Sequence, residues 1–201
     1  MRRRVDPSQQ WLAFLRNHRE LTVAFDLFTV PTVTFRLLYC FFVIEHGRRR
    51  ILHLNVTAHP TADWIVQQLR EALPEAPPYR YAIFDHDSKF NDDVIRLLRS
   101  TGLEPKRTTV RSPWQNGTAE RWVGSCRREM LHYVIALDER HLRRLLRDYV
   151  DYYHHDRIHD ALKKDTPNER PVKKRPASAA KVISSSRLGG LHHRYDWPAA
   201  A

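Results

Sequence analysis

Three carboxylates occupy positions where an acidic side chain is either unusual or well placed for chemistry. Asp26 interrupts the apolar run LTVAFDLFTV (21–30), in which a carboxylate is costly to bury unless it is paired or binds a metal. Asp85 ends the apolar stretch YAIF and opens a loop, where α/β sheets usually place functional groups. Glu120 follows the Asn-Gly step of SPWQNGTAERW (112–122). These residues are therefore the first candidates for a shared site.

The donor types indicate a hard cation at such a site. Three oxygen ligands without a cysteine cluster favour Mg²⁺ or Mn²⁺. Two such ions, bridged by carboxylates, activate a water or a 3′-hydroxyl and stabilise the leaving oxygen at a phosphodiester. Each residue also has a plainer interpretation: Asp26 as a water-facing residue of an edge strand, and Asp85 as a turn former or helix cap. Asp87 competes with Asp85 for the same role.

Hydrophobic periodicity predicts the elements that carry these side chains. Alternating apolar and β-branched residues predict strands over 21–30, 32–46, 50–57, 79–85 and 103–110. Apolar spacings of three and four predict helices over 61–73, 92–102, 117–135 and 138–156. The first three strands form an antiparallel meander, and the later alternation of strand and helix predicts a mixed α/β sheet flanked by helices. If the first and fourth strands are neighbours, Asp26 and Asp85 lie side by side, with the Glu120 helix packed across them.

Composition and charge limit the class of protein. The chain has 201 residues, 42% of them hydrophobic, which suits one globular core with appendages. Its 34 basic and 23 acidic residues give a net charge of +11, which favours a polyanionic partner, nucleic acid first. Two isolated cysteines predict no disulfide framework and favour a reducing compartment such as the cytoplasm. The longest apolar run, 37–44, is too short to cross a membrane, so no membrane partner is expected.

We expect three regions along the chain. Residues 1–20 are polar and basic and form an N-terminal linker or remnant, with a short helix around SQQWLAFLRNH. Residues 21–170 form the globular core. Residues 171–201, which include PVKKRPASAAKVISSSR, are basic and rich in proline and predict a flexible C-terminal tail.

Basic residues around the Glu120 segment are candidates for contact with nucleic-acid phosphates. Arg121 and Arg128 are seven residues apart on the predicted helix and so share a face. An ordinary solvated basic surface is an equally open interpretation. Asn116 is a further candidate, although we favour a role as the N-cap of the helix. The full candidate set is Lys106, Arg107, Arg111, Asn116, Arg121 and Arg128.

The histidine-rich stretch HHDRIH offers a weaker, different hypothesis. It places His155 and His159 four residues apart, a spacing at which two histidines on one helix face can bind zinc. No third ligand is evident in the sequence, so zinc remains a minor alternative.

Four segments carry a resemblance to a known family. AFDLFTV, YAIFDHDSKF and SPWQNGTAERW resemble the three signature blocks in the catalytic core of DDE transposases and retroviral-type integrases. YYHHDRIHDAL is similar to the stretch that closes such cores in bacterial insertion-sequence transposases. The resemblance covers about residues 20–170. It implies a ribonuclease H-like fold in which Asp26, Asp85 and Glu120 are catalytic ligands of two Mg²⁺ or Mn²⁺ ions.

The resemblance also implies a function and partners. The expected reaction is metal-dependent cleavage of a DNA strand, followed by strand transfer into target DNA, by a homo-multimer assembled on DNA. The Ser-Pro…Asn-Gly segment would act as a hinge that lets Glu120 join the metals last. The chain departs from the family where Asp87 replaces a common glycine, and it starts almost at the core, as a truncated copy would. A ribonuclease H-like nuclease and a non-catalytic DNA-binding remnant stay open as alternatives.

Overall fold

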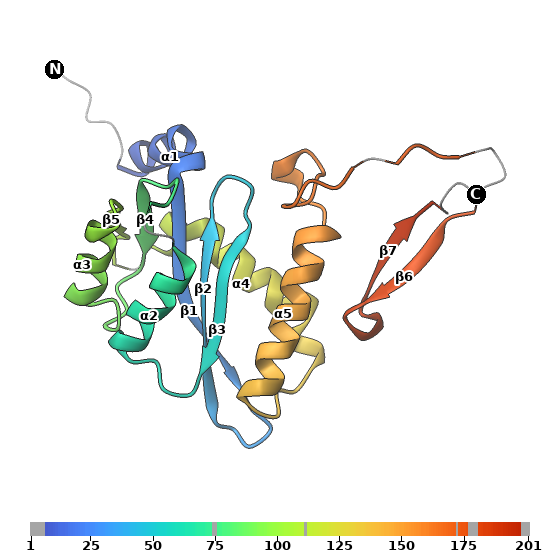
Figure 1. Cartoon of the computed structure of the whole chain (residues 1–201), viewed down its shortest axis with the longest axis horizontal. Helices are drawn as coiled ribbons and strands as arrows, with labels where there is room; N and C mark the ends of the chain where they lie inside the picture. Colours follow the sequence, from blue (N-terminus) through green and yellow to red (C-terminus); the bar gives the residue numbers. More distant parts are fainter. Residues whose placement is uncertain (1–6, 74–75, 111, 172, 177–180, 198–201) are drawn as a thin grey trace.

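A five-stranded mixed sheet forms the centre of the computed structural model, which describes residues 7–73, 76–110, 112–171, 173–176 and 181–197 (Figure 1). The strands lie in the order β3-β2-β1-β4-β5. β1–β2 and β2–β3 pair antiparallel, whereas β4 runs parallel to β1 and to β5. The predicted meander and the predicted contact between the first and fourth strands are therefore confirmed. The bounds are Thr22–Pro31 (β1), Leu37–Glu45 (β2), Ile51–Thr57 (β3), Tyr81–Phe84 (β4) and Glu104–Arg107 (β5).

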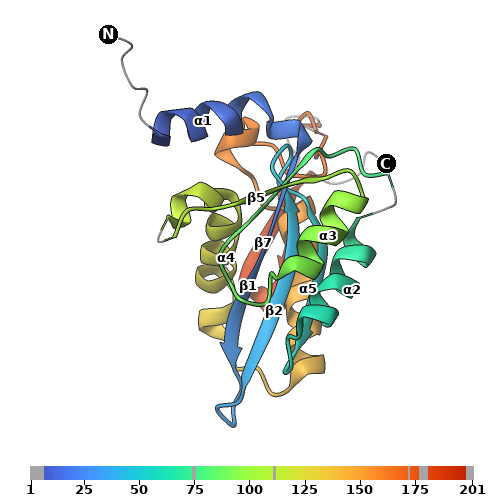
Figure 2. The same cartoon turned by 90° about the vertical axis from the view of Figure 1, so that its left-hand side faces the viewer.

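Helices cover both faces of this sheet (Figures 1 and 2). α2 and α3 pack on one face, and α4 and α5 pack on the other. None of the helices in the described segments is long and apolar enough to cross a bilayer. The helix bounds are Pro7–Asn17 (α1), Ala62–Ala72 (α2), Asp92–Ser100 (α3), Gly117–Glu129 (α4) and Glu139–His155 (α5).

The alternation of side chains along β1 decides which face receives Asp26. Val23 and Phe25 pack into the core beneath α2 and α3, whereas Ala24 and Phe28 pack into the core beneath α4 and α5. Successive residues of a strand point to opposite faces, so Asp26 shares the face of Ala24 and Phe28. The fold therefore directs Asp26 toward the layer that contains the Glu120 helix.

Two element boundaries differ clearly from the prediction, and in each case a main-chain hydrogen bond stabilises irregular structure where a strand or helix was expected. The second strand begins at Leu37 instead of residue 32, since the Thr32 N–H donates to the Arg36 carbonyl (2.8 Å). The fourth helix ends at Glu129 instead of residue 135. Past that point the chain turns back to β1, where the Val33 N–H donates to the Ala136 carbonyl (2.8 Å).

Part of the expected flexible tail forms a β-hairpin. β6 (Ile183–Arg187) and β7 (His192–Asp196) pair antiparallel, and Gly189 and Gly190 in the connecting turn have φ of 65° and 97°. Glycine adopts such positive φ angles without steric penalty, so the Gly-Gly step allows the strands to reverse. The prediction of a tail without regular structure is wrong for these residues. The division of the chain into three regions stays a prediction.

Asp156, at the C-terminal end of α5, anchors this hairpin to the core. Its side chain is 2% exposed and accepts from Arg187 Nε (2.6 Å) and Arg194 Nη1 (3.0 Å). His192 Nε2 also donates to the main-chain carbonyl of Glu129 (2.9 Å). The hairpin is thus held by a nearly buried carboxylate that bridges two arginines.

We expect Asp156→Asn to loosen the hairpin while the core stays folded. The amide cannot neutralise two guanidinium groups, and loss of hydrogen bonds to a charged group reduces stability by roughly 1.5–3 kcal/mol. Hydrogen exchange of the amides of residues 183–196 should accelerate, with little change in the five-stranded sheet. Asp151→Asn is the matched control, because Asp151 lies on the same helix with a 69% exposed side chain. Equal exchange rates in both variants would contradict the anchoring role.

Candidate active site

Asp26 is a partly buried carboxylate without a cationic partner. The main-chain N–H of Leu27 donates to its Oδ1 (2.8 Å), and no lysine or arginine in the described segments forms an ion pair with it. Burial, then repulsion by Asp85, Glu120 and Asp87, raises the pKa of Asp26 to about 8, against the opposing hydrogen bond from Leu27. The charges of both other predicted ligands therefore act on Asp26. It is not the solvent-facing residue of an edge strand, because β1 is the central strand.

Asp85 follows β4 directly and faces the same layer as Asp26. The parallel register pairs Ala24 with Ile83, so Asp26 and Asp85 each lie two residues beyond the last pair on neighbouring strands. The main-chain N–H of Asp87 donates to Asp85 Oδ1 (2.9 Å). Asp26 and Asp85 are thus the two predicted ligands that lie on adjacent strands and face the same layer.

Asp87 differs from Asp85 because its carboxylate forms an ion pair with a lysine. Lys89 Nζ lies 3.1 Å from both Asp87 oxygens, and the Lys89 N–H donates to Oδ1 (2.9 Å). Its charge also affects Asp26 less than the charge of Asp85 does. The geometry therefore favours Asp85 over Asp87 as the partner of Asp26.

Glu120 lies in the first turn of α4 and is exposed to solvent. Its repulsion of Asp26 is weaker than that of Asp85. Among the described residues, no three His, Cys, Asp or Glu side chains are arranged to hold a metal ion together. Two of the three predicted ligands thus lie on adjacent strands, and the third lies in the first turn of α4, where its charge also acts on Asp26.

Asn116 immediately precedes α4, but its side chain does not cap the helix. The residue is 2% exposed, and neither Oδ1 nor Nδ2 has a hydrogen-bond partner within the described segments. A capping residue usually has extended backbone angles, whereas Asn116 ends a short 3₁₀ turn (Pro113–Asn116) with φ −108° and ψ 36°. The favoured cap role is therefore wrong, and its contact with nucleic acid stays a prediction.

The predicted phosphate-contact residues do not form one surface. Lys106 pairs with Glu104 and lies over the Phe14 ring (5.6 Å). Arg107 donates to the Phe90 carbonyl. Arg111 lies outside the described residues.

The two arginines of α4 also differ in their surroundings. Arg121 lines a cavity beside the helix. Arg128 is exposed and folds back over Gly124, where an added Cβ would lie 3.0 Å from its Nη1. The shared face expected for these two residues therefore does not make a shared site.

The two histidines of the zinc hypothesis lie on different elements. α5 ends at His155, and His159 follows in the next turn with an exposed fraction of only 4%. His155 Nδ1 lies 3.0 Å from an Asp151 carboxylate oxygen, whereas His159 Nδ1 lies 3.2 Å from Arg157 Nη1. The expectation that they share one helix face is wrong, because the helix ends between them.

Comparison with known sequences finds similarity to a known family over part of the chain. Residues 101–167 match the family model described as integrase core domain. Transposase InsD for insertion element IS2A/D/F/H/I/K of Escherichia coli is 35% identical over 78 residues, which are 39% of this chain and 26% of that protein. The chain spans 26% to 36% of the curated relatives it matches first.

Solved structures share the fold at low sequence identity. The catalytic domain of Mos1 transposase, solved with raltegravir and Mg, has a TM-score of 0.60 at 13% identity, covering 71% of this chain and 78% of that one. The HTLV-2 integrase catalytic core, solved with magnesium, has a TM-score of 0.58 at 9% identity, covering 75% and 95%. The resemblance seen in the sequence is thus confirmed: residues 101–167 match the integrase core domain family, and the chain has the ribonuclease H-like fold of integrase and transposase catalytic domains.

Proposed function

We propose that this chain is the catalytic core of a DNA transposase or integrase, a polynucleotidyl transferase that cuts a DNA strand and joins it to target DNA. The observation that carries the proposal is the meeting of Asp26 and Asp85 on adjacent parallel strands, beneath the helix that bears Glu120. Similarity to the InsD transposases supports it. We assign catalytic roles to these three side chains.

The carboxylates fit a divalent metal. Asp26 is partly buried beside Asp85 and has no positively charged partner among the described residues. Oxygen donors of this kind suit Mg²⁺ or Mn²⁺. When bound, two such ions would supply positive charge at the phosphodiester and increase the acidity of the attacking water or 3′-hydroxyl. Asp26 and Asp85 would hold them, and Glu120 would complete the ligand set.

The chain itself contributes placement and closure. β1 and β4 fix Asp26 and Asp85 through their parallel hydrogen bonds, which makes them the rigid half of the site. Glu120 follows a short 3₁₀ turn whose Asn116 amide is buried without partners, an unfavourable arrangement that a changed turn would relieve. We propose that DNA binding shifts this turn and brings Glu120 toward the two aspartates.

The proposed function also implies an oligomeric state and a cellular location. One structural neighbour, with a TM-score of 0.62 at 12% identity, belongs to a simian T-cell lymphotropic virus intasome. We propose that this chain likewise acts as a multimer on DNA, because strand transfer must handle two DNA ends together. The cytoplasmic location stays a prediction.

The proposal is tested by the metal-dependent nicking of supercoiled plasmid and the joining of a 3′-hydroxyl oligonucleotide to it. We expect both products with Mn²⁺ or Mg²⁺ and neither in the presence of a chelator, because the carboxylates need the cation to approach a phosphodiester. Metal-independent products would contradict the proposal. DNA binding without any product, at saturating metal and with a cognate end supplied, would reduce the function to DNA binding.

We also expect the affinity for DNA to fall steeply with salt. Each phosphate neutralised by a lysine or arginine contributes about −0.9 to the slope of log K against log[salt], so three to five contacts give a slope of about −2.7 to −4.5. Fluorescence anisotropy of a labelled duplex between about 50 and 200 mM salt measures this slope. A flat response would show that the basic residues do not contact phosphates.

A further inference from the structure

A cavity of about 230 Å³ lies between α4, the turn that joins β2 to β3 and the segment after α5. Arg121, Trp122 and Ser125 line it from α4, Arg49 from the turn, and Arg157 and His159 from the segment after α5. The chemistry proposed for the three carboxylates uses none of these side chains. The cavity therefore needs an explanation of its own.

Two arginines of this cavity have no anionic partner. Arg157 pairs with Glu129 (2.7 Å), whereas neither Arg49 nor Arg121 has a hydrogen bond or ion pair from its side chain to any described residue. Burial lowers the pKa of Arg49, Tyr153 opposes this shift, and the positive charges of Arg121, Arg19 and Arg157 each lower the pKa by a smaller amount. The arginines thus repel one another across a shared space.

The acidic residue in the lining does not cancel this charge. Asp160 also lines the cavity, but its carboxylate pairs with Lys164. The cavity therefore keeps a net positive charge with room for an anion.

Two buried N–H groups in the lining also lack an acceptor. Trp122 Nε1 and His159 Nε2 are buried without a hydrogen-bond partner. Unpaired buried donors are rare in folded proteins, because each gives up its hydrogen bond to water. Both groups can only be satisfied by a hydrogen-bond acceptor.

The tautomer of His159 follows from its neighbour. Arg157 Nη1 lies 3.2 Å from His159 Nδ1, and a guanidinium only donates, so Nδ1 accepts. Burial, then Arg157 and Arg49, lower the pKa of His159 to about 4, although the main chain of Tyr153 partly opposes this shift. The ring is therefore neutral near pH 7, and its single proton is on Nε2.

We propose that this cavity binds a phosphate group, held by Arg49 and Arg121, with Trp122 and His159 in its lining. Phosphate presents acceptor oxygens without needing donors in return, and arginine suits it through paired hydrogen bonds. The volume of about 230 Å³ accommodates a phosphate group.

The source of the phosphate depends on the proposed function. If the chain acts on DNA, the ligand is a backbone phosphodiester, bound next to Glu120 because Arg121 is the following residue of α4. Binding there would then help to set the position of that helix. Free inorganic phosphate has the same recognition chemistry and is the second source.

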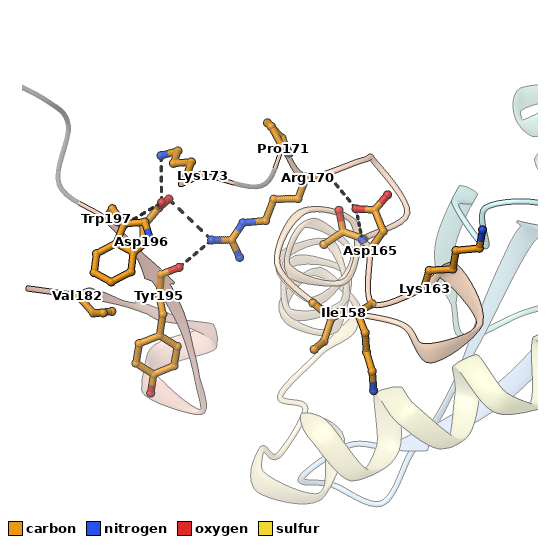
Figure 3. Close-up of a pocket in the computed structure, with 12 residues that line it drawn as sticks. Ile158, Lys163, Asp165, Arg170, Pro171, Lys173, Val182, Tyr195, Asp196 and Trp197 are labelled. Carbon is orange, nitrogen blue, oxygen red and sulfur yellow. Dashed lines mark hydrogen bonds and ion pairs between the residues drawn. The ribbon is translucent and has the colours of Figure 1, made fainter. Parts of the chain in front are cut away.

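The larger cavity, of about 520 Å³, between the core and the hairpin does not offer the same chemistry (Figure 3). Three of its four lining cations already have an acidic partner, since Lys173 lies 3.1 Å and Arg170 3.8 Å from the Asp196 carboxylate and Lys164 pairs with Asp160. The smaller cavity is therefore the better anion site.

The test is a titration of the whole chain, without metal or DNA, with inorganic phosphate at constant ionic strength. Nitrogen-15 NMR follows the Trp122 indole, assigned by Trp122→Phe, and the His159 imidazole. We expect both signals to shift and saturate, with the Kd at least tenfold higher in Arg49→Gln and in Arg121→Gln. Arg144→Gln, which removes the same charge from an exposed position on α5, should bind phosphate as wild type does.

The outcomes separate the sources and the two proposals. If a short DNA duplex moves the same two signals, the ligand is a backbone phosphate; if only the free ion does, the cavity is a small-anion site. If neither ligand shifts the two signals in the wild-type chain, the proposal is overturned. Because this titration uses no metal and no cleavage, its failure leaves the proposed strand chemistry untouched, and the reverse also holds.

Discussion

Glu120→Gln, Asp26→Asn and Asp85→Asn should each reduce Mn²⁺-dependent DNA nicking at least about a hundredfold, the loss typical of removing one preorganised electrostatic group. Each change keeps the size of the side chain and removes the negative charge that would hold the cation. Initial rates on supercoiled plasmid, at equal protein and metal concentrations, measure the effect. Circular dichroism should show that each variant remains folded.

The three positions should respond differently in stability. Burial and neighbouring carboxylates raise the pKa of Asp26 to about 8, so the side chain is largely neutral near pH 7 without metal, and Asp26→Asn should not lower the melting temperature in metal-free buffer. Glu120 is exposed, so Glu120→Gln should leave the melting temperature nearly unchanged. Loss of activity without loss of stability is the pattern expected of a functional site and not of a structural one.

Two matched variants sharpen this experiment. Asp87→Asn removes the competing carboxylate, which pairs with Lys89, and should change the rate only a few-fold. Asp148→Asn removes an exposed charge from α5 and should have no effect. If Asp87→Asn abolished nicking while Asp85→Asn did not, the ligand assignment would be wrong, even though the metal-dependent chemistry would stand.

The positions of the three carboxylates could be predicted because they depend on short-range rules. Alternation along LTVAFDLFTV is enough to put Asp26 on the face opposite Phe25, and Phe25 packs in the core beneath α2 and α3. The contact between β1 and β4 follows from the meander and the first crossover connection. Sequence periodicity therefore predicted that Asp26 and Asp85 lie on neighbouring strands.

The cavity beside α4 could not be predicted, because its lining comes from distant parts of the chain. Arg49 lies in a turn with a φ of 64°, and it meets α4 and the segment after α5 only through tertiary packing. The sequence signals were one arginine run in a turn and the histidines near residue 159. Neither indicates that the two segments meet.

The failed predictions at Asn116 and His159 both concern side chains next to a helix end. The helix ends themselves agree with the prediction to within one residue, since α4 begins at Gly117 and α5 ends at His155. Asn116 is buried at the end of a 3₁₀ turn and cannot adopt extended capping angles. His159 is drawn beneath Arg157 instead of continuing α5. Boundary residues are therefore the least predictable part of this site.

Glu129→Gln should produce the largest loss of stability among single substitutions of charged residues outside the carboxylate site. Glu129 accepts from Arg157 Nη2 (2.7 Å) and from the hydroxyl of Tyr149 (3.0 Å), and its side chain is only 20% exposed. Glutamine turns an acceptor oxygen into a donor that faces Arg157, whose charge is then left without its partner. We expect a loss of roughly 2–4 kcal/mol, toward the lower end for a broken buried pair because both partners keep some exposure.

Urea unfolding measures this loss, and an exposed pair on the neighbouring helix supplies the control. Glu139 pairs with Arg143 across one turn of α5 (2.6 Å), and their side chains are 40% and 35% exposed. Glu139→Gln should cost about 0.5 kcal/mol or less. Similar losses for the two variants would show that the Glu129 pair stabilises the fold no more than an exposed pair does.

The pH dependence of the same variant gives an independent check with a defined sign. Burial tends to raise the pKa of Glu129, but the hydrogen bond and charge of Arg157, with the Tyr149 hydroxyl, hold it below the ordinary 4.5. A carboxylate with a lowered folded pKa stabilises the fold above its unfolded pKa, and this contribution is lost as the pH falls through the folded pKa. The stability gap between wild type and Glu129→Gln should therefore be full above about pH 5 and shrink in more acidic solution. A gap that is constant down to about pH 3 would mean that the carboxylate charge does not hold Arg157 in place.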